Sequence, residues 1–179
     1  MEFSACYEKR VASITDFFSA TFCAAEGATE GALIGGLVQK LLTETAPKDI
    51  HVFTALKDGA LVGAAIFTRL VYAHDVRQVF LLSPMAVASN SQRQGIGQAL
   101  LRHALARLRE ANIEIVITYG DPRFYGKLGF TAITEEMAPA PLPLSHPHGW
   151  VAQSLRGNGF APLKGPSICV MALSDPHFW

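Results

Sequence analysis

The chain has 179 residues, half of them hydrophobic and only 17% charged, which is enough apolar side chain for one domain with a sizeable core. Fifteen Lys and Arg balance fifteen Asp and Glu, and this balance argues against a nucleic-acid-binding protein that uses a broad basic face. The longest apolar stretches, such as LVGAAIF, are too short to cross a bilayer, and the polar residues 1–10 do not resemble a signal peptide. We therefore expect a single domain over residues 1–179, with neither nucleic acid nor membrane as partner.

The cysteines are few and scattered. Cys6, Cys23 and Cys169 are odd in number and form no CxxC pair. They predict reduced, mostly buried thiols of a cytoplasmic protein.

The first half of the chain predicts two helices and three strands. Residues 2–8 read as a short strand, and apolar spacing predicts helices over 11–25 and from Thr29 to a stop at Pro47. Two β-rich runs surround Asp58-Gly59, which is a strong hairpin signal. A more fully apolar strand follows over residues 77–87.

The second half continues as strands alternating with helices. A helix is expected from near Ile96 to Asn112, then a buried strand over 113–118 and a short helix that Asp121 caps and Gly129 ends. After a proline-rich stretch, residues 149–155 and 167–173 predict two late strands. The order β-α-α-β-β-β-α-β-α-β-β indicates an α/β protein, a mixed sheet with helices on its faces.

Two glycines lie where the third helix has to begin. Glycine in a helix costs about 1 kcal/mol relative to alanine, so Gly95 and Gly97 require a reason. A loop between a strand and a helix exposes backbone N–H groups and the positive end of the helix dipole, and glycine lets an anion approach them. We interpret the junction as a cradle for a pyrophosphate. A dinucleotide-binding oxidoreductase is disfavoured because the third glycine of GxGxxG is missing, and a P-loop because GK[ST] is missing.

QRQGIG, with Gln92, Gly95 and Gly97, resembles the motif (Q/R)xxGx(G/A) of the GNAT superfamily of N-acetyltransferases. MAV at 85–87 is similar to the end of that family's splayed fourth strand, and FYGKLGF at 124–130 is similar to its FYxKxGF segment. The resemblance implies the GNAT fold, a mixed central sheet with a splayed fourth strand and helices on both faces. GDPRFY and the late SICVMALSDPHFW resemble a poorly characterised bacterial group of these N-acetyltransferases.

The resemblance implies acetyl-coenzyme A (acetyl-CoA) as the acetyl donor. Its pyrophosphate would meet backbone amides of the glycine loop, and its pantetheine arm would pair with the main chain of the fourth strand, where an amide would polarise the thioester carbonyl. The cofactor-binding residues are then Met85, Ala86, Val87, Gln92, Arg93, Gln94, Gly95, Ile96, Gly97 and Gln98.

Tyr125 matches the family tyrosine that is usually read as the acid for the departing thiolate. A thiol with a pKa near 8.5 and a phenol with a pKa near 10 are close enough for proton transfer. The alternative is that Tyr125 only packs on the cofactor arm. The chain departs from the family at Asp121, where many relatives have Asn, and at Gly126, where the residue is normally larger; an N-cap alone would explain Asp121.

The base that deprotonates the amine is not evident. Some relatives have a glutamate on the fourth strand, but VFLLSPMAV contains no carboxylate. Five side chains are candidates for the base: Glu26, Glu30, Glu44, His146 and His148. For each glutamate, a position on a solvated helix face is the better interpretation. Our hypothesis is that deprotonation is assisted weakly or remotely, which suits an amine of low pKa. The two histidines lack a third ligand at a recognisable spacing, so no metal site is predicted.

The sequence therefore predicts direct transfer of acetyl to a primary amine, without a cysteine intermediate. A non-catalytic acyl-CoA-binding or sensing domain and an enzyme for a longer acyl group are the alternatives. The acceptor stays open among a small molecule, a peptide N-terminus and a protein lysine, and a homodimer stays open too.

Overall fold

The computed structural model describes all residues, 1–179. The chain divides into two compact units, of which the first comprises Met1–Phe67 with Pro84–Ala104 and the second Thr68–Ser83 with Leu105–Trp179. Three elements, β3 (Ala60–Tyr72), β4 (Val79–Val87) and α3 (Ile96–Glu110), each begin in one unit and end in the other.

The strands of the first unit begin at the N-terminus. β1 (Glu2–Ser4) pairs antiparallel with β2 (Ile50–Lys57), with Phe3 opposite Ala55. β2 continues into β3 through Asp58 and Gly59, whose φ angles of 53° and 81° are those of a tight hairpin turn. The predicted hairpin is confirmed.

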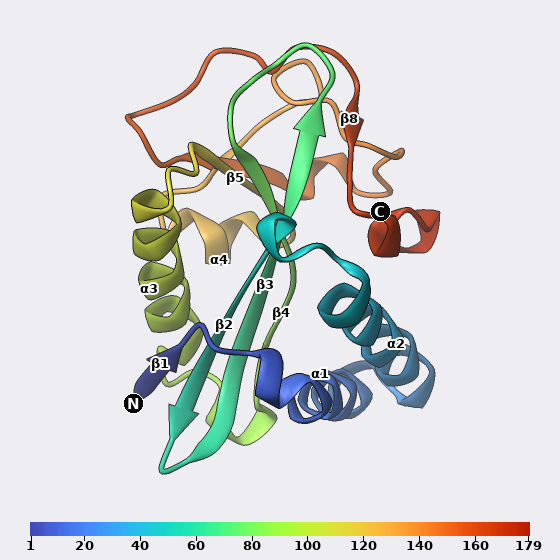
Figure 1. The fold of residues 1–179 in the computed structure, drawn as a ribbon, viewed down its shortest axis with the longest axis vertical. Coiled ribbons are helices and arrows are strands. Elements are labelled where there is room, and N and C mark those ends of the chain that lie inside the picture. The colour runs from blue at the N-terminus through green and yellow to red at the C-terminus, as the bar shows by residue number, and fades with distance from the viewer. The chain divides into compact units, whose positions relative to one another are not determined.

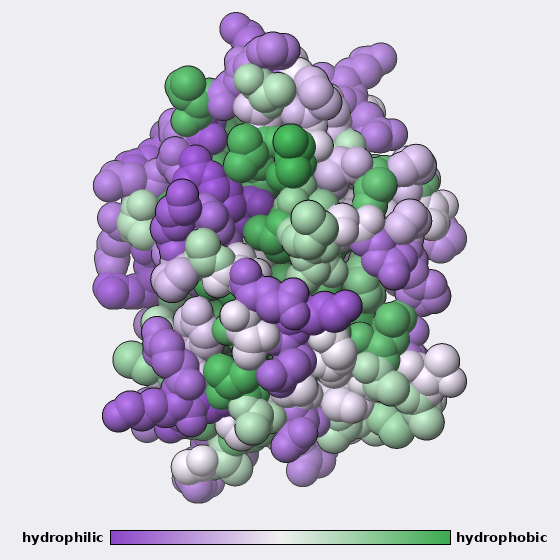
Figure 2. Space-filling view, turned by 45° about the vertical axis from the view of Figure 1, so that its right-hand side comes forward, coloured by the Kyte–Doolittle hydropathy of each residue, from purple (hydrophilic) through white to green (hydrophobic).

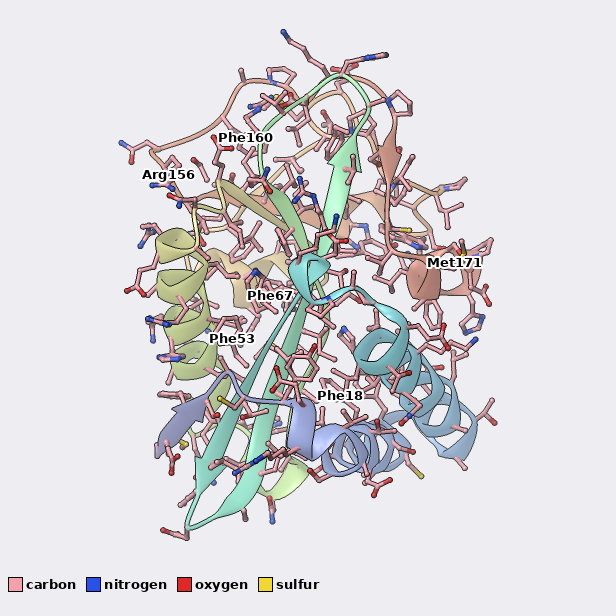
Figure 3. The ribbon with its side chains drawn as sticks, in the orientation of Figure 1. Phe18, Phe53, Phe67, Arg156, Phe160 and Met171 are labelled. Atoms are coloured by element: carbon pink, nitrogen blue, oxygen red, sulfur yellow. The ribbon has the colours of Figure 1, made fainter.

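Helices α1 (Val11–Glu26) and α2 (Ala28–Glu44) lie side by side in the first unit (Figure 1). Their buried faces follow the predicted spacing: Ile14, Phe18, Ile34, Leu37, Val38, Leu41 and Leu42. Within the sheet Phe53 and Phe67 face each other edge to face, with ring centroids 5.8 Å apart (Figure 3). Both helices of the sequence analysis are thus present.

The second unit is built on β5 (Ile115–Tyr119). Its parallel partner is the first half of β4, with Val79 opposite Ile115, and its antiparallel partner is β7 (Trp150–Ser154). β7 pairs in turn with β6 (Thr131–Ala132), which gives the strand order β1-β2-β3-β4-β5-β7-β6. The mixed, mostly antiparallel sheet flanked by helices confirms the predicted fold class.

Two features near the C-terminus differ from the prediction. Only Ser167–Ile168 of the segment 167–173 form a strand, β8, while Met171–Leu173 form a 3-10 turn. β8 pairs antiparallel with the last residues of β3, Val71 and Tyr72, and it begins opposite the end of that partner. The two-residue β6 was not predicted because its pairing depends on a distant strand.

The cysteines also correct the prediction. All three thiols are free, but Cys6 and Cys23 are exposed and Cys169 is partly exposed, so "mostly buried" was wrong. Cys6 lies in the connection after β1, and Cys23 lies in the second half of α1, a helix that fully buries only Ile14 and Phe18. The cytoplasmic location stays a prediction. No helix has the length and apolar character to span a bilayer.

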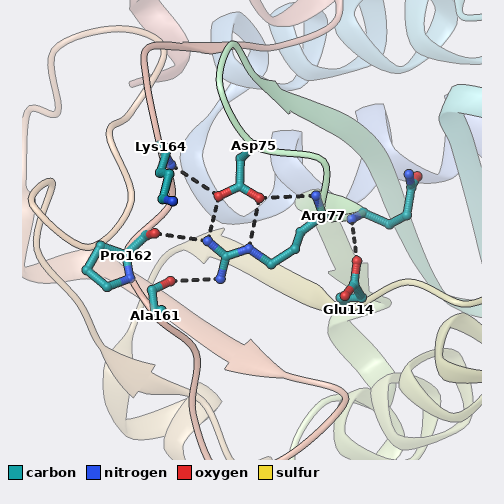
Figure 4. Close-up of polar contacts among 7 residues, drawn as sticks. Asp75, Arg77, Glu114, Ala161, Pro162 and Lys164 are labelled. Carbon is teal, nitrogen blue, oxygen red and sulfur yellow. Dashed lines mark hydrogen bonds and ion pairs between the residues drawn. The ribbon is translucent and has the colours of Figure 1, made fainter.

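An ion pair fixes the connection between β3 and β4 (Figure 4). The Arg77 guanidinium donates to both carboxylate oxygens of Asp75, at 2.8 and 2.6 Å, and to the carbonyl oxygens of Ala161 and Pro162, at 2.8 and 2.9 Å. The N–H of Lys164 also donates to Asp75, and these bonds hold the pKa of the buried Asp75 carboxyl well below its usual range. The cluster attaches the segment 161–164 to a hairpin far away in sequence.

The surface carries scattered apolar side chains. Figure 2 shows hydrophobic patches separated by hydrophilic ones. Val71 and Ile168, register partners in the β3–β8 pair, are both exposed, as is Met171. Such small patches are normal for a folded surface, and the homodimer stays a prediction.

Candidate functional site

The first component of the site is the end of β4. The parallel ladder between β4 and β5 runs only from Val79 and Ile115 to Leu82 and Thr118, although β4 continues to Val87. Pro84 lies two residues after Leu82 and has no N–H to donate to a ladder. Residues 83–87 therefore lie outside the β5 ladder, and this is the splayed strand that the resemblance implied. Of the residues expected to bind there, Ala86 is buried while Met85 and Val87 are partly exposed.

The second component is the loop from β4 to α3, in the same unit. Arg93 and Gly95 have φ angles of 61° and 79°, the left-handed region that suits glycine. A Cβ at Gly95 would meet no protein atom within 4 Å. The positive φ of the turn thus accounts for glycine at position 95. The space into which a Cβ would point is not filled by protein atoms. The Gln92 amide donates to the Val87 carbonyl oxygen at 3.2 Å and holds the loop against the strand end.

The third component is the first turn of α3. The first helical bond runs from the Ala99 N–H to the Gly95 oxygen, at 3.0 Å. The N–H groups of Ile96, Gly97 and Gln98 precede it and have no acceptor within the helix. Together with the dipole of a helix of 15 residues, they favour a bound anion.

Burial refines which loop residues are accessible. Gln92, Arg93, Gln94 and Gly95 are exposed, Gln98 is partly exposed, and Ile96 and Gly97 are buried. A Cβ at Gly63 of β3 would lie 3.3 Å from Leu100 and 3.5 Å from Ile96, so the first turn of α3 packs closely on the sheet. An anion would therefore approach this junction from the side of Gln92–Gly95.

Tyr125 lies in the second unit, on the short helix α4 (Pro122–Gly126). Asp121 caps this helix by accepting from the Arg123 N–H at 2.9 Å, as the sequence predicted, and Gly129 follows with a φ of 90°. Burial raises the pKa of the Tyr125 phenol, and the Thr118 hydroxyl acts in the opposite direction. The phenol is therefore protonated at neutral pH and can act as a proton donor.

A cavity of about 600 Å³ lies at the carboxyl end of β5. Residues 119–123 line one side, and His146, His148 and Gly149 line the other. The imidazoles lie 5.8 Å apart between centroids, and the His146 N–H donates to the Tyr119 hydroxyl. Sequence reasoning singled out the two histidines but missed Tyr119, because only the fold brings it to them.

The remaining base candidates show no comparable arrangement. Glu26 and Glu44 are exposed at the ends of α1 and α2, and Glu30 is half-buried in the first turn of α2. No group of three or more His, Cys, Asp or Glu side chains could hold a metal ion.

Comparisons with known proteins identify a similar domain, a similar sequence and similar folds. Residues 48–132 match the model of the acetyltransferase (GNAT) domain. The chain is 29% identical over 124 residues to the uncharacterised N-acetyltransferase YjhQ of Escherichia coli K12, covering 66% of this chain and 68% of the relative.

Two solved structures share the fold. The GNAT family N-acetyltransferase YhbS from Escherichia coli in complex with CoA superimposes with a TM-score of 0.77 at 18% identity, over 97% of this chain and 92% of the other. A GNAT family acetyltransferase from Brucella melitensis in complex with acetyl-CoA gives 0.73 at 21% identity, over 96% of each chain.

The matched domain over residues 48–132 is that of GNAT acetyltransferases, as the three sequence motifs indicated. More particularly, the whole chain is similar in fold to the solved GNAT structures.

Proposed function

We propose that this protein is an acetyl-CoA-dependent N-acetyltransferase that transfers acetyl directly to a primary amine. One observation carries the proposal: a strand end outside its ladder, a left-handed glycine loop and a helix N-terminus follow one another within residues 83–98. The complexes of YhbS with CoA and of the Brucella protein with acetyl-CoA support the choice of donor.

The donor would be held mainly by main-chain atoms. Met85, Ala86 and Val87 lie on the part of β4 outside the β5 ladder, and the main chain there suits the amides of an extended pantetheine arm, which would pair as an added strand does. The amides of residues 92–98 suit the diphosphate, because the loop exposes N–H groups at the positive end of α3. An amide of the strand end would also stabilise the oxyanion that develops on the thioester carbonyl.

Tyr125 would return a proton to the leaving thiolate. Burial raises the pKa of the phenol, so the phenol keeps the proton that it would donate. The neutral amine nitrogen attacks the carbonyl carbon, the C–N bond forms, the C–S bond breaks, and the sulfur takes the phenolic proton. The proton that the nitrogen then loses passes to the phenolate or to water. The alternative role of Tyr125, packing alone, predicts no loss of rate without its hydroxyl.

The amine has to lose a proton before it attacks. For a lysine-type amine at pH 7 the neutral form costs about 4.6 kcal/mol, against about 1 kcal/mol for an α-amine. The lack of a carboxylate on β4 supports weakly assisted deprotonation, so among amines of similar shape the rate should rise as the pKa of the amine falls.

The proposal is tested by following thiol release from acetyl-CoA with a panel of small primary amines and peptides. We expect amine-dependent release of coenzyme A above the rate of hydrolysis. Binding of acetyl-CoA without turnover of any amine would instead identify the non-catalytic binding domain.

A further inference from the structure

We propose that the cavity between residues 119–123 and 146–149 is the acceptor site, and that it takes a monoamine with a flat aromatic body. This inference rests on the proposed acetyltransferase function. It adds a substrate class and a place for the substrate, both of which the sequence left open.

The cavity is next to the tyrosine proposed as the acid. A Cβ at Gly120, which lines the cavity, would lie 2.8 Å from Cε2 of the Tyr125 ring. Gly120 therefore both lines the cavity and lies against the Tyr125 ring.

The wall of the cavity is fixed by close backbone contacts. The Gly120 N–H donates to the Gly149 oxygen at 2.9 Å, just beyond the pairing of Tyr119 with Trp150. A Cβ at Gly149 would lie 3.2 Å from the Gly120 oxygen and 3.2 Å from the Tyr119 ring. Since side chains at these positions would collide with neighbouring wall atoms, the two glycines allow the wall to pack closely.

The segment that carries the histidines is anchored on both sides. Before His146, the Ser145 N–H donates to the main-chain oxygen of Trp179 at 3.0 Å. After His148, the buried Trp150 donates its indole N–H to the Ala138 oxygen at 2.9 Å. Such anchoring reduces the conformational entropy lost when a ligand is bound.

The lining selects for flat, weakly charged ligands. Tyr119, His146 and His148 contribute three aromatic side chains to the lining, and aromatic groups gain about 0.5–1.5 kcal/mol from stacked or edge contacts beyond their burial. The volume of about 600 Å³ is within the usual range for small-molecule sites.

The charges of the cavity disfavour polycations. Asp121 is the single carboxylate in the lining, and the Arg123 side chain already lies 3.3 Å from it. A ligand with several ammonium groups would therefore meet a guanidinium and no unpaired carboxylate. One ammonium group can still be accommodated, because the Asp121 carboxylate is half exposed.

The test compares two aromatic monoamines, tryptamine and 2-phenylethylamine, with two polycations, spermidine and kanamycin A, at saturating acetyl-CoA. We expect kcat/KM for the aromatic amines to exceed that for the polycations by about tenfold or more, the factor that 1.4 kcal/mol of contact provides. Equal or better use of spermidine or kanamycin A would overturn the inference.

Variants locate the effect. His148→Ala and His146→Ala should each raise KM for tryptamine, while His148→Phe, which keeps a flat ring, should restore a KM close to that of the wild type. His177 is an exposed histidine that does not line the cavity, so His177→Ala is the matched control and should leave KM unchanged.

The acetyl-CoA dissociation constant separates this inference from the proposed function. It should be unchanged in all four variants. An unchanged tryptamine KM in both alanine variants, or a weaker acetyl-CoA affinity in them, overturns the acceptor assignment alone. A wild-type protein that binds no acetyl-CoA overturns both.

Discussion

Gly120 lies so close to Tyr125 that a Cβ at position 120 would stand 2.8 Å from the tyrosine ring. The end of β5 thus determines where the phenol of α4 lies. A side chain at position 120 would move the ring, so the position of the Tyr125 phenol depends on glycine at position 120.

Replacing Tyr125 by Phe should lower kcat by about a hundredfold, the lower end of what a positioned proton donor contributes. The acetyl-CoA dissociation constant should not change, because the ring stays in place. Tyr7→Phe removes a hydroxyl whose pKa is also raised by burial, but far from α4 in sequence, and serves as the control. An unaltered kcat in Tyr125→Phe would show that Tyr125 only packs.

The raised pKa of Tyr125 has a consequence for the pH profile. The donating form is the neutral phenol, so the wild-type enzyme should keep this proton donor up to and beyond pH 10, the ordinary value for tyrosine. Steady-state rates between pH 6 and 10, at saturating acceptor, check this expectation. A decline of kcat near pH 8 that is absent in Tyr125→Phe would contradict it.

Gly95→Ala should weaken acetyl-CoA binding and destabilise the fold by about 1–2 kcal/mol, because alanine resists the φ of 79° found there. Since the Cβ would meet no protein atom, the loss would come from backbone strain alone. Gly36→Ala is the matched control: its Cβ also meets nothing, but the residue lies within α2, where alanine should stabilise by about 0.5–1 kcal/mol. Chemical denaturation and calorimetry measure the two effects.

Arg77→Ala should lower the free energy of unfolding by about 2–3 kcal/mol, because it leaves the buried Asp75 carboxylate without its partner. Arg107→Ala breaks the exposed pair with Glu110 and should change stability by less than about 0.5 kcal/mol. Urea denaturation of the two variants would contradict this account if their losses were equal.

The same cluster predicts how stability depends on pH. The pKa of Asp75 is lower in the folded than in the unfolded chain, so its contribution is complete above the unfolded value of about 3.9 and is lost as the pH falls below it. The difference in stability between the wild type and Asp75→Asn should therefore be constant from pH 5 to 8 and shrink below about pH 4. A constant difference down to pH 2.5 would show that the carboxylate charge is not what stabilises the cluster.

Local signals predicted most of the fold. Asp58-Gly59 defines its hairpin by its own backbone preference, and the apolar spacing of α1 and α2 is contained within each helix. β6 was not predicted and β8 was predicted too long, because each is two residues long and is defined by a partner strand elsewhere. Pro84 was an available sign of the splayed strand, since a residue without N–H two positions after Leu82 cannot extend the ladder.

The site divides in the same way. Gly95, Asp121 and Tyr125 belong to short contiguous motifs, so sequence alone could place them on a loop, a cap and a helix. The contact of His146 with Tyr119 joins positions 27 residues apart, and the bonds of Arg77 join positions more than 80 apart. Such contacts depend on the pairing of β5 with β7 and on the path of the C-terminal segment, which no local pattern encodes.

The central claim is that main-chain amides between β4 and α3 bind the diphosphate of coenzyme A. Calorimetric titration of the wild-type protein with coenzyme A and with pantetheine, which lacks the diphosphate, tests it most directly. We predict that coenzyme A binds at least about tenfold more tightly, since anion contacts at a helix N-terminus contribute on the order of 1 kcal/mol or more. Equal affinity for the two compounds, or no binding of coenzyme A, would contradict the claim.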